Sequence, residues 1–498
     1  MTLQYDVGVV GYGACSAVLV NLLAESGLSV VVFEKEADVL AIPRAAHFDD
    51  ETVRTFQVLG AADDLSASFS TSAAYGIYNS LNQRVWGADE VSNLPTDQGW
   101  LSDYFFFQPD FEHYLRDKAA KRGVVAKISC EVTDFAEEAD TVLISYKNLQ
   151  NQNEHADQVS VKYLVGADGA NSFVRKRLGS EMEKLAESQR WLIVDIRLHD
   201  GVDATLSSDC WTKVDKDETI TFVPMPNNMK RFEYALAADQ NEADVCSDEA
   251  VAQFLAKWFE RGSYDVLRAN VYHFHSQVAK SWRQGRVFLA GDAAHLTPPF
   301  LGQGVCTAIR DAMNIAWKLA RVLKGESPAA LLESYETERR PHAYTFVYIA
   351  GMVGEKIRWL ASATPEELAA AAKEEYSGVR PPLGVGLHDP QARAAGMLGP
   401  QPRLTDGRLM DYQIGYNFAL VGDPTLIASL QPATNALLDK MQVVRVPDSG
   451  AGMETPLAAL GGRAMLIRPD HYLIGVAQDT AELNALVTGL AGHLLEAE

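Results

Sequence analysis

Two glycines and one acidic residue near the N-terminus form the first pattern that could bind a ligand. Gly11 and Gly13 follow an apolar run and precede a segment with helical spacing of apolar residues, and Glu34 ends a second β-branched run. In such a strand–turn–helix–strand unit, the helix N-terminus can bind a pyrophosphate and the acid can accept hydrogen bonds from ribose. The pattern predicts a dinucleotide site, although Ser16 replaces the third glycine of the usual fingerprint. It does not choose between FAD and a nicotinamide nucleotide, and the plainer alternative is an ordinary β–α–β unit with a glycine-rich turn.

Two later segments repeat the theme of a polar turn after a short apolar strand. Asp168 and Asp292 each lie in a turn that follows such a strand. Gly302 and Gly304 then open a long segment with helical spacing, which ends before Gly325. A helix that begins there would direct free backbone N–H groups and the positive end of its dipole toward an anionic ligand.

Together these segments resemble the class A FAD-dependent aromatic hydroxylases, and most closely their 3-(3-hydroxyphenyl)propionate hydroxylase branch. That branch shares the pattern PRA…DDE…R (residues 43–54), FFFQP (105–109) and GDAAHLTPPFLGQGVCTAIRDAMNIAWKL (291–319). The resemblance covers most of residues 1–345. It implies an α/β FAD-binding Rossmann-type domain, a β-sheet substrate domain of the α+β kind and a thioredoxin-like C-terminal domain.

The same resemblance, with a change of composition after residue 380, suggests how the chain is divided. The FAD-binding domain is expected to be discontinuous, over 1–70, 101–179 and 281–345, with the substrate domain over 71–100 and 180–280. A helical connection over 346–392 and the thioredoxin-like domain over 393–498 follow. We expect a packing or homodimer role for the last domain, because it contains no cysteine for thiol chemistry.

The resemblance assigns a set of residues to FAD through turn amides, acids that accept from ribose or ribityl hydroxyls, an arginine near the pyrophosphate and the second helix start. These residues are Gly11, Gly13, Ala14, Cys15, Glu34, Lys35, Arg44, Gln108, Asp168, Gly291, Asp292, Pro299, Gly302, Gly304, Val305 and Cys306. The alternatives are a surface salt bridge for Arg44, a helix cap for Gln108 and a turn residue for Asp168. His295 is expected to be structural.

A histidine is the candidate catalytic base. In the related hydroxybiphenyl hydroxylases a histidine close to the position of His47 is thought to deprotonate the phenol, and an imidazole suits that task. Asp49 is the expected orienter, and the alternative is an exposed or helix-capping histidine. Three aromatic residues, Trp211, Phe222 and Tyr234, could line a flat substrate pocket, although each could equally belong to the core.

The resemblance implies a FAD-dependent monooxygenase that hydroxylates a phenolic or related aromatic compound with NADH or NADPH and O2, through a flavin C4a-hydroperoxide. One alternative is a tailoring hydroxylase that acts on a polycyclic or heteroaromatic metabolite. An alternative of another class is a non-catalytic FAD-binding redox sensor. NAD(P)H-driven, substrate-stimulated O2 uptake would distinguish the enzymes from the sensor.

The composition excludes several other classes. Hydrophobic residues make up 47% and the formal charge is −22, which disfavours disorder and binding to nucleic acid or an anionic membrane. The five cysteines are scattered without a CxxC, so neither a disulfide scaffold nor a zinc site is indicated, and no metal is expected. No apolar run approaches a membrane span and no leader pattern is seen, so a cytoplasmic protein is expected.

Overall fold

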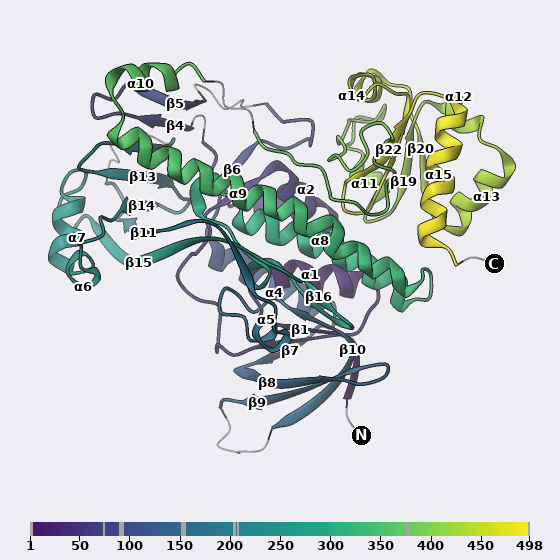
Figure 1. Cartoon of the computed structure of the whole chain (residues 1–498), viewed down its shortest axis with the longest axis horizontal. Helices are drawn as coiled ribbons and strands as arrows, with labels where there is room; N and C mark the ends of the chain where they lie inside the picture. Colours follow the sequence, from purple (N-terminus) through teal and green to yellow (C-terminus); the bar gives the residue numbers. More distant parts are fainter. Residues whose placement is uncertain are drawn as a thin grey trace.

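The structure is a computed structural model that describes residues 3–72, 75–88, 94–150, 156–202, 206, 209–374 and 378–496. Parts of the predicted domain ranges therefore lie outside the described residues, at 1–2, 73–74, 89–93, 151–155, 203–205, 207–208, 375–377 and 497–498. Figure 1 shows two large sheets and a smaller C-terminal unit arranged around two long central helices.

The β-branched runs at the N-terminus form the middle of the first sheet, in which β1 pairs in parallel with β2 and β10. The strand order is β16-β17-β10-β1-β2-β7, and β9 pairs with both β10 and β8. Residues such as Val7, Val9 and Val31 are fully buried, as expected for parallel strands covered on both faces. The strands are β1 (Leu3–Val10), β2 (Val30–Glu34), β7 (Val125–Ile128), β8 (Cys130–Glu137), β9 (Val142–Asn148), β10 (Asp157–Gly166), β16 (Arg283–Gln284) and β17 (Val287–Leu289).

The second sheet is built mainly from antiparallel neighbours, in the order β18-β15-β11-β14-β13-β12-β4-β5. Its strands are β4 (Tyr75–Tyr78), β5 (Arg84–Ala88), β11 (Met182–Leu198), β12 (Cys210–Val214), β13 (Thr219–Pro224), β14 (Met229–Ala235), β15 (Tyr264–Ala279) and β18 (His295–Leu296). One face packs on the short helices α6 (Glu242–Val245) and α7 (Asp248–Leu255). The other face packs on α9 (Ser334–Ser362) and on a ribbon of β3 (His47–Asp49) and β6 (Asp103–Phe105).

Helices α1 and α8 lie near the centre of the molecule and pack on each other. The helices of this part are α1 (Ala14–Glu25), α2 (Asp50–Val58), α3 (Ala62–Ser66), α4 (Gln108–Lys121), α5 (Phe173–Leu178), α8 (Gly304–Leu323), α9 (Ser334–Ser362) and α10 (Pro365–Ala371), with 3-10 turns η1 (Gly291–Ala293), η2 (Pro299–Leu301) and η3 (Ala329–Glu333). Helix α9 runs through the predicted boundary at residue 345, so that boundary lies inside a continuous helix. The other domain bounds stay predictions.

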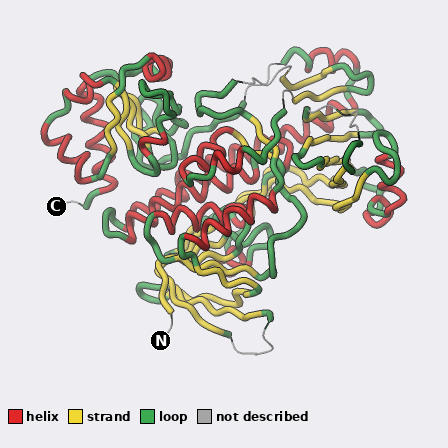
Figure 2. Tube along the Cα trace, turned by 180° about the vertical axis from the view of Figure 1, so that it is seen from behind, coloured by secondary structure: helices red, strands yellow, loops and turns green. Residues whose placement is uncertain are grey.

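The C-terminal unit contains a sheet of order β20-β19-β21-β22, in which β19 and β20 are parallel and β21 is antiparallel to both of its neighbours. Its elements are α11 (Asp411–Ile414), β19 (Ala419–Gly422), α12 (Pro424–Ala428), α13 (Pro432–Lys440), β20 (Val444–Pro447), α14 (Ala451–Ala459), β21 (Ala464–Ile467), β22 (Leu473–Ala477) and α15 (Thr480–Leu494). This mixed sheet is compatible with a thioredoxin-like unit, which stays a prediction. Figures 1 and 2 place the unit and the strands β4 and β5 at opposite ends of the molecule.

Two negative observations apply to the described residues only. In that part of the chain, no helix is long and apolar enough to cross a bilayer. The same residues contain no cluster of three or more His, Cys, Asp or Glu side chains arranged to hold a metal ion.

Candidate active site

The N-terminal glycine turn lies where β1 ends and α1 begins. Gly11 has a φ of +89°, and a Cβ at this position would lie 2.5 Å from the carbonyl oxygen of Ala167. Only glycine therefore lets the ends of β1 and β10 approach this closely. Gly13 is the N-cap of α1, and no side chain caps the helix. The first backbone N–H groups, from Ala14 onward, are thus available to an anion.

Glu34 lies at the end of β2 beside this turn. Its carboxylate accepts hydrogen bonds from the backbone N–H groups of Tyr12 (2.8 Å) and Glu36 (3.0 Å). These bonds fix the carboxylate next to the start of α1 and leave acceptor positions for hydroxyl groups. Lys35 points into solvent, 4.0 Å from Glu36, so nothing in the structure brings its side chain to the turn. Its cofactor role stays a prediction.

Gln108 fixes the segment that carries Arg44. The Gln108 Oε1 accepts hydrogen bonds from the N–H groups of Arg44 and Ala45, both at 2.8 Å, and its Nε2 donates to Glu112 at 2.6 Å. The Arg44 guanidinium would lie 3.7 Å from a Cβ at Gly13, so it stands beside the start of α1. Gln108 therefore positions a cation at the expected pyrophosphate site and does not cap α4, whose N-cap is the preceding residue.

The second helix start lies at the end of the η2 turn that Pro299 opens. Helix α8 begins at Gly304 with Gln303 as an N-cap whose side chain makes no capping bond, and Thr307 is the residue whose N–H bonds to the Gln303 carbonyl. The N–H groups of residues 304–306 therefore remain free for an acceptor at the positive end of a long helix. The predicted helix start is confirmed, and its contact with the flavin stays a prediction.

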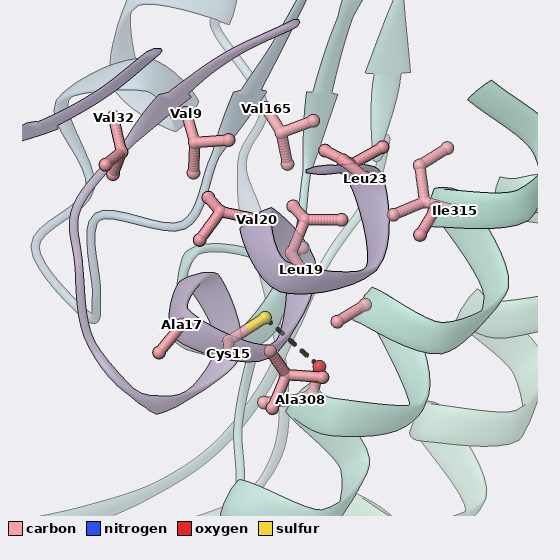
Figure 3. Packing of buried hydrophobic residues seen from close by; sticks show 14 of the residues in the cluster. Val9, Cys15, Ala17, Leu19, Val20, Leu23, Val32, Val165, Ala308 and Ile315 are labelled. Atoms are coloured by element: carbon pink, nitrogen blue, oxygen red, sulfur yellow. Dashed lines mark hydrogen bonds between the residues drawn. The ribbon is translucent and has the colours of Figure 1, made fainter. Parts of the chain in front are cut away.

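The two cysteines at the helix starts are packing residues in the structure. The Cys15 thiol donates to the Ala308 carbonyl at 3.1 Å and joins α1 to α8, as Figure 3 shows. The Cys306 thiol faces the carbonyls of His47 and Gly302 at 3.8 and 3.7 Å. Burial raises the pKa of both thiols, so neither is a ready thiolate.

Asp292 of the GDAAH turn and Asp311 of the following helix α8 lie in opposite environments. Asp311 on α8 is buried and accepts from the N–H of Gly291 (3.0 Å), from His295 Nε2 (2.8 Å) and from Arg339 (3.0 Å). Burial alone would raise the pKa of Asp311, but the charges of His295 and Arg339 outweigh it and lower that pKa. Asp292 is exposed and makes no hydrogen bond or ion pair with any described residue. His295 is thus part of the buried support, and Asp292 is free to bind a ligand.

Asp168 is engaged by its own loop. Its carboxylate accepts from the Ser172 hydroxyl at 2.5 Å and from the Val174 N–H at 3.0 Å, at the start of α5. Burial raises its pKa despite these bonds. The structure therefore supports the alternative interpretation of Asp168 as a turn residue, and its contact with a cofactor stays a prediction.

His47 lies between the second helix start and an aspartate that the sequence analysis missed. Its Nε2 is 2.8 Å from Asp103 and its Nδ1 is 3.2 Å from the Gly302 carbonyl oxygen. Gly302 has a φ of +64°, and a Cβ there would lie 2.6 Å from Nδ1, so the histidine needs a glycine beside it. Burial would lower the pKa of His47, but the bond to Asp103 outweighs it and raises that pKa well above its ordinary value.

The prediction that Asp49 orients His47 is wrong. Asp49 is the N-cap of α2 and accepts from the Thr52 N–H (2.9 Å) and hydroxyl (2.6 Å), while Arg310 holds its other oxygen. No local pattern along the chain points to Asp103, because β3 and β6 become neighbours only in the folded ribbon. Only its position two residues before the FFFQP stretch could have drawn attention to it.

The prediction that Trp211, Phe222 and Tyr234 line the substrate pocket stays a prediction, and their packing favours the alternative that they belong to the core. Trp211 stacks on Phe222 with ring centroids 5.4 Å apart, and Tyr234 contacts Phe254 of α7. All three belong to the apolar cluster under α6 and α7. Alternation along a strand places them on one face, but it does not show which face the ligand meets. The face toward β3 and β6 carries Cys210, Val223 and Met229 instead.

The residues around the two helix starts fit a bound FAD. Uncapped N–H groups, the carboxylate of Asp292 and the Arg44 guanidinium offer donors, an acceptor and a cation, and none of them makes a hydrogen bond or ion pair with another described residue. The contact of Cys15 with Ala308, and of Gly291 with both, brings the two helix starts together.

Comparison with known proteins agrees with this geometry. The model of the family described as FAD binding domain matches residues 4–350. The chain is 31% identical to a probable NADH-specific resorcinol 4-hydroxylase of Rhodococcus jostii, over 99% of this chain and 95% of that protein. It is 28% identical to a 3-(3-hydroxy-phenyl)propionate/3-hydroxycinnamic acid hydroxylase of Mycolicibacterium smegmatis, over 97% and 93%. A crystal structure of aklavinone-11 hydroxylase with FAD and aklavinone shares the fold at a TM-score of 0.79 and 21% identity, over 99% and 100%.

The chain therefore belongs to the FAD binding domain family. It is a flavin-dependent monooxygenase of the aromatic hydroxylase class, as the resemblance implied.

Proposed function

We propose that the protein hydroxylates a phenolic ring with NADH and O2. One oxygen atom enters the ring as a new hydroxyl, the other leaves as water, and NADH with one proton supplies the two electrons and the hydrogen. The observation that carries this proposal is the His47–Asp103 pair at the start of α8. The choice of NADH follows the probable NADH-specific resorcinol 4-hydroxylase of Rhodococcus jostii, which is similar to 99% of this chain.

The cofactor site is proposed to hold FAD through the start of α1, Glu34, Arg44, Asp292 and the start of α8. When bound there, FAD supplies hydride acceptance and oxygen activation. The protein supplies the positive ends of α1 and α8 and the carboxylates that would pair with ribose and ribityl hydroxyls.

His47 would act as the proton acceptor for the phenol. In its protonated form the ring donates to Asp103 through Nε2 and to the Gly302 carbonyl through Nδ1. When the ring is neutral, the Nε2–H stays on Asp103, because the carboxylate is the stronger acceptor. The lone pair is then on Nδ1 and faces the Gly302 carbonyl oxygen at 3.2 Å, so the imidazole turns away from that carbonyl before Nδ1 takes the phenolic proton. The resulting phenolate donates electrons to the incoming oxygen far better than a phenol does.

Purified protein, loaded with FAD, tests the proposal with NADH or NADPH and a panel of phenols. We expect NADH oxidation and O2 uptake that rise on addition of a phenol, and a product heavier by one oxygen atom. A polycyclic acceptor as the only substrate would replace the proposal with the tailoring reaction. Absence of flavin reduction by either nucleotide would favour the redox sensor.

A further inference from the structure

One acidic side chain, on the face of the second sheet that looks toward β3 and β6, makes no hydrogen bond or ion pair with any described residue. Glu233 on β14 pairs in register with Ile193 and Thr221, and shares its face with Arg231 two residues earlier. That face is opposite to the one that carries Phe232 and Tyr234 under α7. Arg231 donates to the carbonyls of Pro43 and Arg44, so this face looks toward the segment that leads into β3.

Glu233 is 7% exposed, and its carboxylate makes no hydrogen bond or ion pair with any described residue. Burial raises its pKa, with Arg231 and Arg268 opposing this effect. The Glu233 oxygens are not among the fully buried polar atoms without a partner in the described residues, so they keep contact with solvent and are open to a ligand hydroxyl. The Nε of Arg268 is buried without a partner in the described structure.

The neighbouring charges define what this face can accept. Asp195 accepts from both Arg231 (2.8 Å) and Arg268, so these three side chains together carry one net positive charge. The nearby carboxylate of Glu233 cancels that charge. An arginine pair alone would suit an anionic substrate, whereas the pair with Glu233 does not.

Glu233 belongs to the same region as the proposed base. The Cys210 thiol on β12 is within electrostatic range of both Glu233 and Asp103, whose charges raise its pKa in addition to burial. Asp103 in turn bonds His47. The unpartnered carboxyl group and the proposed proton acceptor therefore lie on facing sides of one region, between the sheet and the β3–β6 ribbon.

We propose that Glu233 binds a second hydroxyl group of the substrate, so that the substrate is a neutral ring with at least two hydroxyls and no carboxylate. This inference rests on the proposed hydroxylase function. A carboxyl group can pair with a hydroxyl in either protonation state, and it repels a carboxylate when charged.

The test combines changes in the protein with changes in the ligand. Dissociation constants are measured by calorimetry on the FAD-loaded protein for resorcinol, phenol and 3-hydroxybenzoate, before any NADH is added. The variants are Glu233→Leu and the near-isosteric Glu233→Gln, with Glu131→Gln on the exposed edge of β8 as the matched control. kcat and KM with NADH are then measured for each pair.

We expect Glu233→Leu to weaken resorcinol about tenfold or more while phenol changes by less than about threefold, because only resorcinol loses a hydrogen bond to a charged group. Glu233→Gln should improve binding of 3-hydroxybenzoate, since the arginine pair is then uncompensated. A purely structural role cannot produce this gain. Equal losses for resorcinol and phenol, or a wild-type preference for 3-hydroxybenzoate, would overturn the role of Glu233. If the wild type hydroxylates no ring, the proposed function fails, whereas the binding measurements still judge Glu233.

Discussion

Charged residues are used in opposite ways at the cofactor site and at the contact with the C-terminal unit. At the cofactor site, Asp292 makes no hydrogen bond or ion pair within the part of the chain that the structure describes, and no side chain caps either helix start. At the C-terminal contact, Glu338, Arg468, Lys318 and Asp470 bind one another and are almost fully buried. The polar groups of the first region remain available to a ligand, whereas those of the second region bind one another.

A second buried pair extends that contact. Arg54 of α2 donates through Nε to Asp411 at 2.6 Å and also bonds Gln98 and the Gly399 carbonyl. His471 lies 3.2 Å from the same Asp411 carboxylate. Arg54, the last residue of the PRA…DDE…R pattern, therefore attaches the C-terminal unit, whereas Arg44 of the same pattern lies beside the start of α1. One family pattern thus contains both ligand-facing and purely structural residues.

The largest loss of stability is expected where Glu338 binds Arg468 and Lys318. Glu338→Ala would leave Arg468 and Lys318 buried with too little opposite charge, at a cost of about 3–5 kcal/mol. Chemical denaturation of the variant should show this loss. Glu249→Ala is the control, because it removes an exposed partner of Arg261 and should cost about 1 kcal/mol or less. Equal effects of the two substitutions would contradict the distinction between the regions.

At the cofactor site, a substitution should weaken ligand binding and leave the stability of the protein unchanged. Asp292→Ala removes a carboxylate that the protein itself does not use, so the apoprotein should unfold at the same temperature as the parent. FAD should bind about 1–3 kcal/mol more weakly, through loss of a hydrogen bond to the ligand. Equilibrium dialysis against FAD measures the affinity. Retention of flavin through gel filtration equal to that of the parent would remove Asp292 from the site.

The His47–Asp103 pair should show an effect of intermediate size. It stabilises the fold as an ion pair, but His47 must lose its proton before it can accept one from the phenol. The raised pKa of His47 means that its stabilising effect is complete below the unfolded value near 6.5 and is lost as pH rises through the folded value. Activity should instead increase as pH rises through that value, because only neutral His47 can accept the phenolic proton. The acid limb of kcat/KM should lie above pH 6.5 in the wild type.

Asp103→Asn should move that limb to lower pH, since burial then acts on His47 without the opposing carboxylate. His47→Gln should abolish the limb while FAD content stays the same. Stopped-flow measurement of hydroxylation across pH 6–9 distinguishes these results. A limb that does not move in Asp103→Asn would leave another group as the proton acceptor.

The smallest effect is expected at the α1–α8 contact of Figure 3. Cys15→Ala removes one thiol hydrogen bond to Ala308 and should cost about 1 kcal/mol, with activity retained. Because burial raises its pKa, the parent thiol should also resist iodoacetamide in the folded protein. Rapid inactivation of the parent but not of Cys15→Ala would show a reactive thiol.

The sequence by itself determined the elements whose signals are local. The glycine turn after β1 and the start of α8 follow from short apolar runs and from glycines at positive φ. These features depend on neighbours within a few residues, so the pattern along the chain contains them.

Only the tertiary structure decided which side chains meet. Asp103 reaches His47 across 56 positions because β3 and β6 pair, and Arg310 takes Asp49 away from the role the sequence suggested. Trp211, Phe222 and Tyr234 lie on neighbouring strands and share one face of the second sheet, yet α7 covers that face. Period-two alternation groups residues by face, but the choice between the faces depends on what packs against the sheet, and that is fixed by distant parts of the chain.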